Sequence, residues 1–129
     1  MNRPISKRIL IVEDDAEMRN MFELLLTGEG YVVVQCKSGE RALALHAEEP
    51  FDLVIIELLL AGHDGFDTLV KLRRTGRPPK VIVTAKSSWT AAEVYFKMAK
   101  QLGADKTLAK PFTAEQFLET ARKLLGKES

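Results

Sequence analysis

Several apolar runs of this sequence end in side chains that could do chemistry together. The set consists of Glu13, Asp14, Asp15, Glu57, Thr84 and Lys110. Carboxylates without histidine or cysteine nearby favour a hard divalent cation, and Mg²⁺ is typically held by one or two carboxylates, water and phosphate oxygens. A hydroxyl, a backbone amide and a lysine around such an ion would bind a phosphoryl group. The pattern therefore indicates Mg²⁺ and phosphate chemistry if the fold brings these residues together.

A parallel sheet covered by helices would do so. Short apolar runs alternate with segments of helical spacing, and the runs are almost continuously apolar instead of alternating in and out. The expected strands are 8–13, 31–36, 53–56, 81–84 and 107–109, and helices are expected over about 14–28, 38–49, 66–76, 91–102 and 113–125. This order predicts an α/β fold with a doubly wound, five-stranded parallel sheet, whose sites lie at the carboxyl ends of the strands.

Capping residues support the expected helix boundaries. Ser38 precedes one helix, and Thr113 with Gln116 has the spacing of a capping box before the last one. Gly103 follows the segment 91–102, which predicts a left-handed residue at the end of that helix.

Each polar residue also has a purely structural explanation. Asp14 or Asp15 could simply cap a helix, with Glu17 completing a capping box from Asp14. Glu57 could be a solvated strand end, and Lys110 an exposed turn lysine. The polar residues taken together favour a functional site. Without one, chance alone would have to place acids, a hydroxyl and a lysine at strand ends that the fold brings together.

Composition limits the class of protein. A chain of 129 residues that is 46% apolar can bury one ordinary core, so we expect a single domain over residues 1–129. The net charge is only +1, and the basic segment 71–80 has no interleaved aromatic residues, so neither DNA nor a membrane is an expected partner. Cys36 is the only cysteine, and no apolar run is long enough to span a bilayer. These features predict a cytoplasmic protein.

Four segments together resemble the receiver domain of two-component response regulators. They are ILIVEDD, DLVIIELLLAGHDG, VIVTAKS and GADKTLAKPF. The resemblance covers Arg8 to Leu125. It implies a flavodoxin-like (βα)5 receiver fold with strand order 2-1-3-4-5, a core over about 8–125, and a signalling module instead of an enzyme.

The resemblance implies a set of metal ligands. Glu13 and Asp14 would be the acidic pair that holds Mg²⁺, and Asp15 would be the helix cap. Glu57 and the backbone carbonyl of Leu59 would be the other ligands. Mg²⁺ is therefore the expected cofactor, with binding that is weak or lost if Glu57 disturbs the site.

The resemblance also implies a phosphoryl-binding group. Thr84 resembles the switch hydroxyl that bonds a phosphoryl oxygen, and the amide of Ala85 would support it. Lys110 resembles the lysine that pairs with the phosphoryl group before a cis-like Lys-Pro bond. Thr107 stands where the family usually has an aromatic residue that rotates with the switch hydroxyl.

The phosphoacceptor position departs from the family, because Glu57 stands where receivers have aspartate. Asp52 and Asp64 are not in register to replace it, and Ala61 stands in place of a family proline. Glutamate moves the carboxylate by on the order of 1 Å, and such a misplacement costs about 100-fold in a positioned reaction. We expect Glu57 on a solvated rim, directed toward Lys110 and Thr84, as a partial mimic of the phosphorylated state.

Three functional hypotheses follow. The first is a phosphorylation-independent receiver that acts by protein binding, with its state set by Glu57. The second is a conventional Mg²⁺-dependent receiver that is phosphorylated weakly on Glu57. The third is a Mg²⁺-dependent phosphohydrolase, which the sequence disfavours because the first strand does not end in a DxD arrangement.

The expected partners are proteins. The resemblance implies a sensor histidine kinase or a phosphotransfer protein upstream, and a protein target downstream. A homodimer through the fourth helix and fifth strand is a further expectation. Trp89, Tyr95 and Phe96 could belong to such a surface or could pack in the core.

Overall fold

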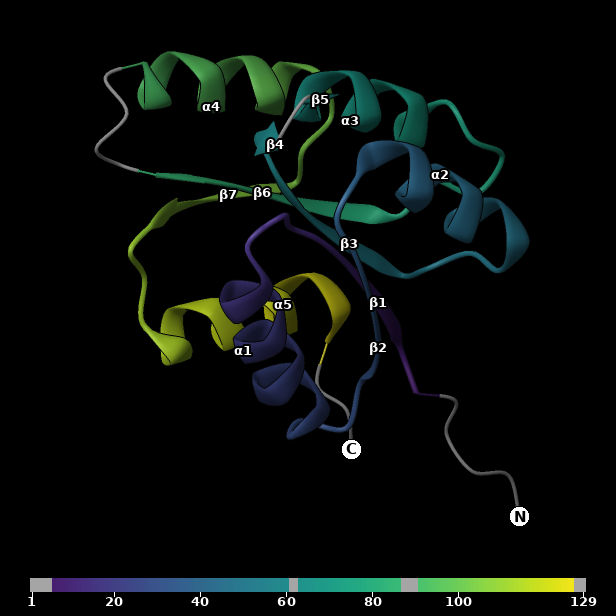
Figure 1. The fold of residues 1–129 in the computed structure, drawn as a ribbon, viewed down its shortest axis with the longest axis vertical. Helices are drawn as coiled ribbons and strands as arrows, with labels where there is room; N and C mark the ends of the chain where they lie inside the picture. The colour runs from purple at the N-terminus through teal and green to yellow at the C-terminus, as the bar shows by residue number, and fades with distance from the viewer. Residues whose placement is uncertain (1–5, 61–62, 87–90, 127–129) are drawn as a thin grey trace.

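The computed structural model of the chain describes residues 6–60, 63–86 and 91–126. Five parallel strands form the central sheet (Figure 1). They are β1 Arg8–Val12, β2 Val32–Cys36, β3 Leu53–Glu57, β6 Lys80–Lys86 and β7 Lys106–Lys110. Their spatial order is β2-β1-β3-β6-β7, which is the predicted order 2-1-3-4-5 because β6 and β7 are the fourth and fifth predicted strands. The predicted α/β fold with a doubly wound, five-stranded parallel sheet is therefore confirmed.

A short antiparallel pair lies outside this sheet. It consists of β4 Leu59–Leu60 and β5 His63–Asp64, and it follows directly after β3. The sequence did not predict this pair, because strands of two residues are too short to show a periodicity. Ala61 and Trp89, which carried two of the expectations above, lie outside the described residues.

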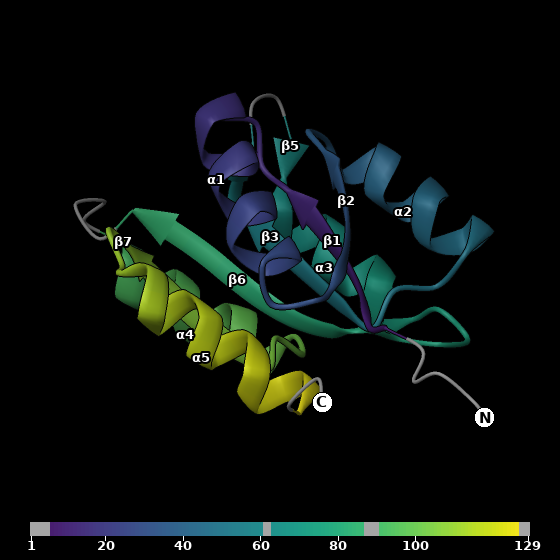
Figure 2. The same cartoon turned by 90° about the horizontal axis from the view of Figure 1, so that it is seen from below.

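Helices cover both faces of the sheet. They are α1 Ala16–Thr27, α2 Gly39–Glu48, α3 Gly65–Arg73, α4 Ala92–Gln101 and α5 Ala114–Leu125. In Figure 1, α1 and α5 lie on one face and α2, α3 and α4 on the other, and Figure 2 shows α1 and α5 in front of the sheet. None of the helices in the described ranges is long and apolar enough to cross a membrane.

The two helical layers enclose two separate apolar clusters. Alternate residues of β1 point to opposite faces, so Ile9 and Ile11 join the cluster under α1 and α5, whereas Leu10 and Val12 join the other. Every residue of β3 is buried, because this strand is central and covered on both faces. The near-continuous apolar strands of the sequence are explained by this two-sided burial.

The helix caps follow the sequence closely, with one change. Ser38 caps α2, and Thr113 with Gln116 forms the predicted capping box before α5. Gly103 has a φ of 114°, as predicted for a left-handed residue after α4. Asp15 caps α1 by accepting hydrogen bonds from the amides of Glu17 and Met18 at 3.0 and 3.2 Å, so the alternative capping box from Asp14 is wrong.

The described aromatic residues of α4 belong to the core. Tyr95 and Phe96 are half-buried and pack against the cluster under α2, α3 and α4, and the ring of Tyr95 lies 5.6 Å from that of Phe66. The core-packing explanation therefore holds for these two residues. Val94 and Met98 on the same helix are instead exposed.

One glycine is required by a close approach of two backbone segments. A Cβ atom on Gly65 would lie 2.7 Å from the carbonyl oxygen of Glu57 and 2.8 Å from the Cα and carbonyl oxygen of Leu58. The Gly65 amide also donates to the Leu58 carbonyl at 2.9 Å. The first residue of α3 is therefore packed directly against the end of β3.

We expect the substitution Gly65→Ala to destabilise the protein by about 1–3 kcal/mol, because an overpacked site forces backbone shifts. Gly76→Ala is the matched control, since nothing lies within 4 Å of a Cβ atom at Gly76. That control should change the free energy of unfolding by less than about 0.5 kcal/mol in either direction. Urea unfolding of the two variants measures both effects, and equal stabilities would contradict the close approach.

Candidate functional site

A cavity of about 440 Å³ lies at the carboxyl ends of the strands, where the sequence predicts a site. It is lined by Glu13, Asp14, Asp15, Met18, Glu57, Leu59, Lys86 and Lys110. These residues come from the ends of β1, β3, β6 and β7, the start of α1 and the β4 strand. The fold thus brings together acids and a lysine that are up to 97 positions apart in the sequence.

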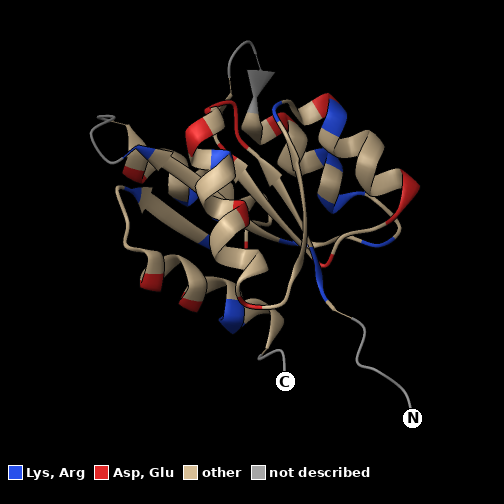
Figure 3. Ribbon diagram, turned by 60° about the horizontal axis from the view of Figure 1, so that its bottom comes forward, with Lys and Arg blue, Asp and Glu red and all other residues tan. Residues whose placement is uncertain are grey.

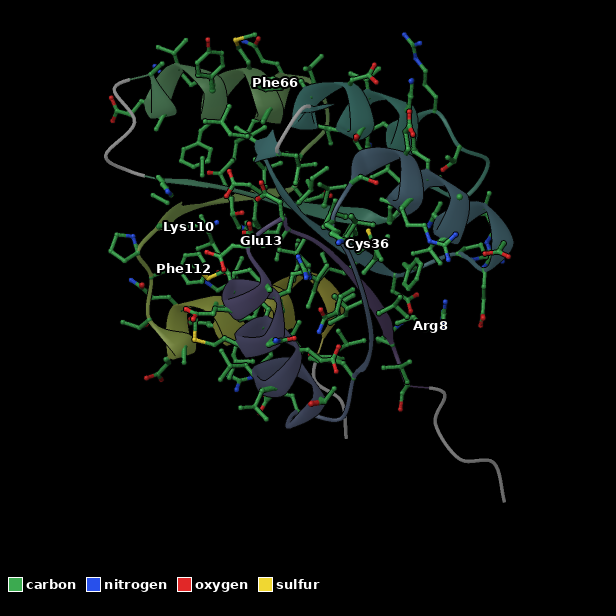
Figure 4. The ribbon with its side chains drawn as sticks, viewed as in Figure 1. Arg8, Glu13, Cys36, Phe66, Lys110 and Phe112 are labelled. Atoms are coloured by element: carbon green, nitrogen blue, oxygen red, sulfur yellow. The ribbon has the colours of Figure 1, made fainter. Side chains whose placement is uncertain are left out.

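The centre of this site is the ammonium group of Lys110. Its Nζ lies 2.6 Å from Oε1 of Glu13 and 2.5 Å from Oε1 of Glu57. Figure 4 shows the labelled side chains of Glu13 and Lys110 next to each other. One positive charge therefore bridges two carboxylates, and it joins β7 to the ends of β1 and β3.

The second oxygen of each carboxylate is held by the backbone. Oε2 of Glu13 accepts a hydrogen bond from the Asp15 amide at 3.2 Å, and Oε2 of Glu57 accepts one from the Leu59 amide at 3.1 Å. The hydroxyl of Thr84 also donates to Oε1 of Glu57, at 3.5 Å. Each of the four carboxylate oxygens thus has at least one donor.

Burial of these groups corrects two expectations. The side chains of Glu57 and Lys110 are only 6% and 9% exposed, so a solvated rim for Glu57 and an exposed turn for Lys110 are both wrong. Two features explain this burial. β3 extends through Glu57, which pairs with Thr84 of β6, and the opposite charges compensate each other inside the protein.

The charges of the site shift two pKa values. Burial raises the pKa of Glu13 above its ordinary value, and the hydrogen bond and charge of Lys110 only partly oppose this. Burial acts to lower the pKa of Lys110, but the hydrogen bonds and charges of Glu13 and Glu57 outweigh it and raise this pKa above 10.5. The stabilisation from Lys110 is therefore fully present below pH 10.5 and is lost as the pH rises through the raised value.

The side chains do not fit a resident Mg²⁺ in this arrangement. Among the described residues, no three Asp, Glu, His or Cys side chains are grouped so that they could hold a metal ion. Glu13 and Glu57 already share Lys110, and Asp15 is used as the cap of α1. Asp14 is exposed at the edge of the cavity, and Leu59 contributes its amide to Glu57.

The structure places the other predicted residues outside the cavity. Thr84 is 1% exposed and lies behind Glu57, and Ala85 is part of the apolar core. Thr107 lines a separate hollow of about 410 Å³ along β7 and α5. Asp52, at the far end of β3, accepts a hydrogen bond from the Arg8 amide at 2.8 Å.

Lys86 is a cavity residue that the sequence reasoning missed. It is exposed at the end of β6, which is longer than the expected strand, and it adds a second positive charge to the cavity lining. Strand alternation was a usable signal, because Lys86 lies two residues after Thr84 and so shares its side of the strand.

A larger hollow of about 620 Å³ lies at the opposite, amino-terminal end of the strands. His46 of α2 lies beside this hollow and is hydrogen-bonded to two loops. Its Nδ1 accepts a hydrogen bond from the Phe51 amide at 3.0 Å, and its Nε2 lies 2.9 Å from the Arg77 carbonyl oxygen. These hydrogen bonds hold the segments before β3 and β6 against α2. The smaller cavity is the better candidate for function, because it contains the buried, coupled charges.

Comparisons with known proteins identify the family of the chain. Residues 9–122 match the family described as response regulator receiver domain. The transcriptional regulatory protein CpxR of Klebsiella pneumoniae is 35% identical over 120 residues, which are 93% of this chain and 50% of that protein. The response regulator ArlR of Staphylococcus epidermidis is 36% identical over 121 residues, covering 93% of this chain and 53% of that protein. The chain thus spans about half the length of these curated relatives.

A solved structure shows the same fold. The chemotaxis response regulator CheY4 of Vibrio cholerae has a TM-score of 0.82 and 24% identity, with 93% of this chain and 99% of that chain covered. At this identity the likeness concerns the fold alone. The family match covers most of the chain, and the receiver domains of response regulators are signalling modules that interact with histidine kinases and downstream effectors. The chain therefore belongs to the response regulator receiver domain family of two-component systems.

Proposed function

We propose that this receiver domain is a protein-binding module whose state is set by Glu57 and not by phosphorylation. One observation supports this above all. The side chains of Thr84 and Lys110, which resemble the phosphoryl-binding groups of the family, both contact Oε1 of Glu57. The carboxylate of the chain itself occupies the position where these groups would bind a phosphoryl oxygen.

The geometry of Glu57 also disfavours phosphoryl transfer. The residue is 5% exposed, and both of its oxygens accept hydrogen bonds or an ion pair. Oε1 already has two donors, Lys110 and Thr84, so Oε2 is the oxygen that keeps a lone pair for attack on a phosphorus atom, and it is held by the Leu59 amide. The added methylene moves the carboxylate by on the order of 1 Å, which is enough to cost about 100-fold.

Glu57 imitates the phosphorylated state in part. It presents one negative charge to Lys110 and Thr84, whereas a phosphoryl group would carry about two. The partners that fit this role are a histidine kinase or a phosphotransfer protein, which would bind without transferring phosphate, and a downstream protein. The relative CpxR is named a transcriptional regulatory protein, and a longer protein that contains this domain would by the same token act on DNA through a further part.

The extent of the domain, its compartment and its oligomeric state belong to the same proposal. We propose one receiver domain over residues 1–129, in the cytoplasm, with Glu57 at the phosphoacceptor position and Thr84, Ala85, Thr107 and Lys110 around the switch. The homodimer stays a prediction, and the apolar residues Val94, Met98 and Leu102, which are exposed on one side of α4 and at its end, would lie in its interface.

The phosphorylation state can be tested directly. We expect no acid-labile phosphate on the wild-type protein after incubation with acetyl phosphate and Mg²⁺, because Glu57 is held in place. Glu57→Asp should be labelled, since it restores the shorter acceptor of the family. Intact-mass spectrometry at neutral pH measures both. Label on the wild type that disappears in Glu57→Gln would instead show a conventional receiver that is phosphorylated on Glu57.

Removal of the bridging lysine should destabilise the fold. Lys110→Met leaves Glu13 and Glu57 buried without a counter-charge, so we expect a loss of about 3–5 kcal/mol in the free energy of unfolding near neutral pH. The control Lys123→Met removes an exposed ion pair with Glu119 and should cost less than about 1 kcal/mol.

The pH dependence of this loss follows from the charges. Burial raises the pKa of Glu13, and in Lys110→Met the lysine no longer opposes this shift. Protonation of Glu13 then relieves the repulsion between the two carboxylates, so the stability difference from the wild type should shrink as the pH falls from about 8 to about 5. Chemical unfolding at both pH values measures it. A difference that is unchanged or larger at the lower pH would show that Lys110 stabilises the fold through packing alone.

A further inference from the structure

We propose that the Lys110 ammonium takes the place of the divalent cation in this receiver domain, so that the site contains its own counter-charge and excludes Mg²⁺. Receiver domains typically bind Mg²⁺ at the phosphorylation site, so this is a departure from the family. The inference rests on the proposed function in one respect, namely that Glu57 stays unmodified. It concerns the regulation of the same site.

The first step is the occupation of the carboxylate oxygens. Glu13 uses one oxygen for Lys110 and the other for the Asp15 amide. Glu57 uses one oxygen for Lys110 and Thr84 and the other for the Leu59 amide. In the described part of the chain, no buried side-chain nitrogen or oxygen lacks a hydrogen-bond partner. The two buried carboxylates are therefore satisfied by groups of the protein itself.

The second step is the cost of replacing Lys110 by a metal ion. Mg²⁺ requires nearly octahedral oxygen ligands at about 2.0–2.1 Å, so it would compete with the ammonium for the same oxygens. Displaced Lys110 would be left buried without its partners, which is strongly unfavourable. Lys86 in the cavity lining adds a second positive charge that repels an incoming cation.

The third step is the length of the side chain at position 57. Glu57 spans the distance from the end of β3 to Lys110 with one oxygen while its other oxygen accepts from the Leu59 amide. An aspartate at this position would be shorter by on the order of 1 Å and could not keep both contacts without a backbone shift. Glu57, which replaces the aspartate that accepts phosphate in the family, therefore also leaves no place for a divalent cation.

The test uses Mn²⁺ as a paramagnetic substitute for Mg²⁺ and follows the backbone amides of Asp15 and Leu59 by NMR. These two amides donate to Glu13 and Glu57, so a bound ion would broaden both. In the wild type we expect no selective broadening and a melting temperature that does not change with Mg²⁺ concentration. Saturable broadening of both amides in the wild type would overturn the inference.

Glu57→Asp should show the opposite behaviour. We expect saturable broadening of the same amides and a melting temperature that rises with the logarithm of Mg²⁺ concentration. Glu119→Asp is the matched control, because it shortens an exposed glutamate of α5 outside the cavity and should behave like the wild type. A folded Glu57→Asp that binds no ion would count against the inference. If Glu57→Asp does not fold, Lys110→Met serves instead, and it too should gain ion binding.

The failure of this inference and the failure of the proposed function are seen in different measurements. A wild-type protein that binds Mn²⁺ but takes no phosphoryl label would overturn the inference and leave the function in place. A wild-type protein that is labelled on Glu57 would overturn the function, whatever its affinity for Mn²⁺.

Discussion

The bridge from Lys110 to Glu13 and Glu57 is the interaction on which the site depends. It brings together charges from the ends of three strands, on side chains that are almost entirely buried. Buried carboxylates repel each other and are costly to desolvate, so the position of each one is tolerable only while the ammonium stays between them. The same bridge fixes the direction of Glu57, and through Glu57 it fixes the hydroxyl of Thr84.

The elements around the bridge are packed closely and hold its residues in place. Gly65 allows α3 to approach the end of β3 closely, and this covers Glu57 from one side. On the other side of the sheet, Phe22, Phe112 and Phe117 stack with centroid distances of 4.5 to 5.7 Å and anchor the chain just after Lys110. Basic and acidic residues are interspersed over the ribbon (Figure 3), and the net charge of the chain is only +1.

The sequence was sufficient for the fold and for most members of the site. Apolar runs, caps and the glycine after α4 are local signals, and the positions of Glu13, Glu57 and Lys110 followed from the rule that strand ends meet at one edge. The burial was harder to predict. The direction of Glu57 toward Lys110 followed from the sequence, but whether the pair lies in water or inside the protein depends on the competition between desolvation and ion pairing, which residue spacing does not show. The β4–β5 pair and the place of Lys86 in the cavity lining were missed, because both depend on how far a strand extends at its end.

The separation of Glu13 and Lys110 along the chain has a consequence for folding. These residues are 97 positions apart, so their contact closes a loop that contains most of the protein, and it forms only after the sheet has been assembled up to its edge strand. Before β7 docks, two carboxylates face each other without compensation. A chain that emerges from the ribosome would therefore keep this end of the sheet loose until its last strand arrives, and the arrival of Lys110 would complete it.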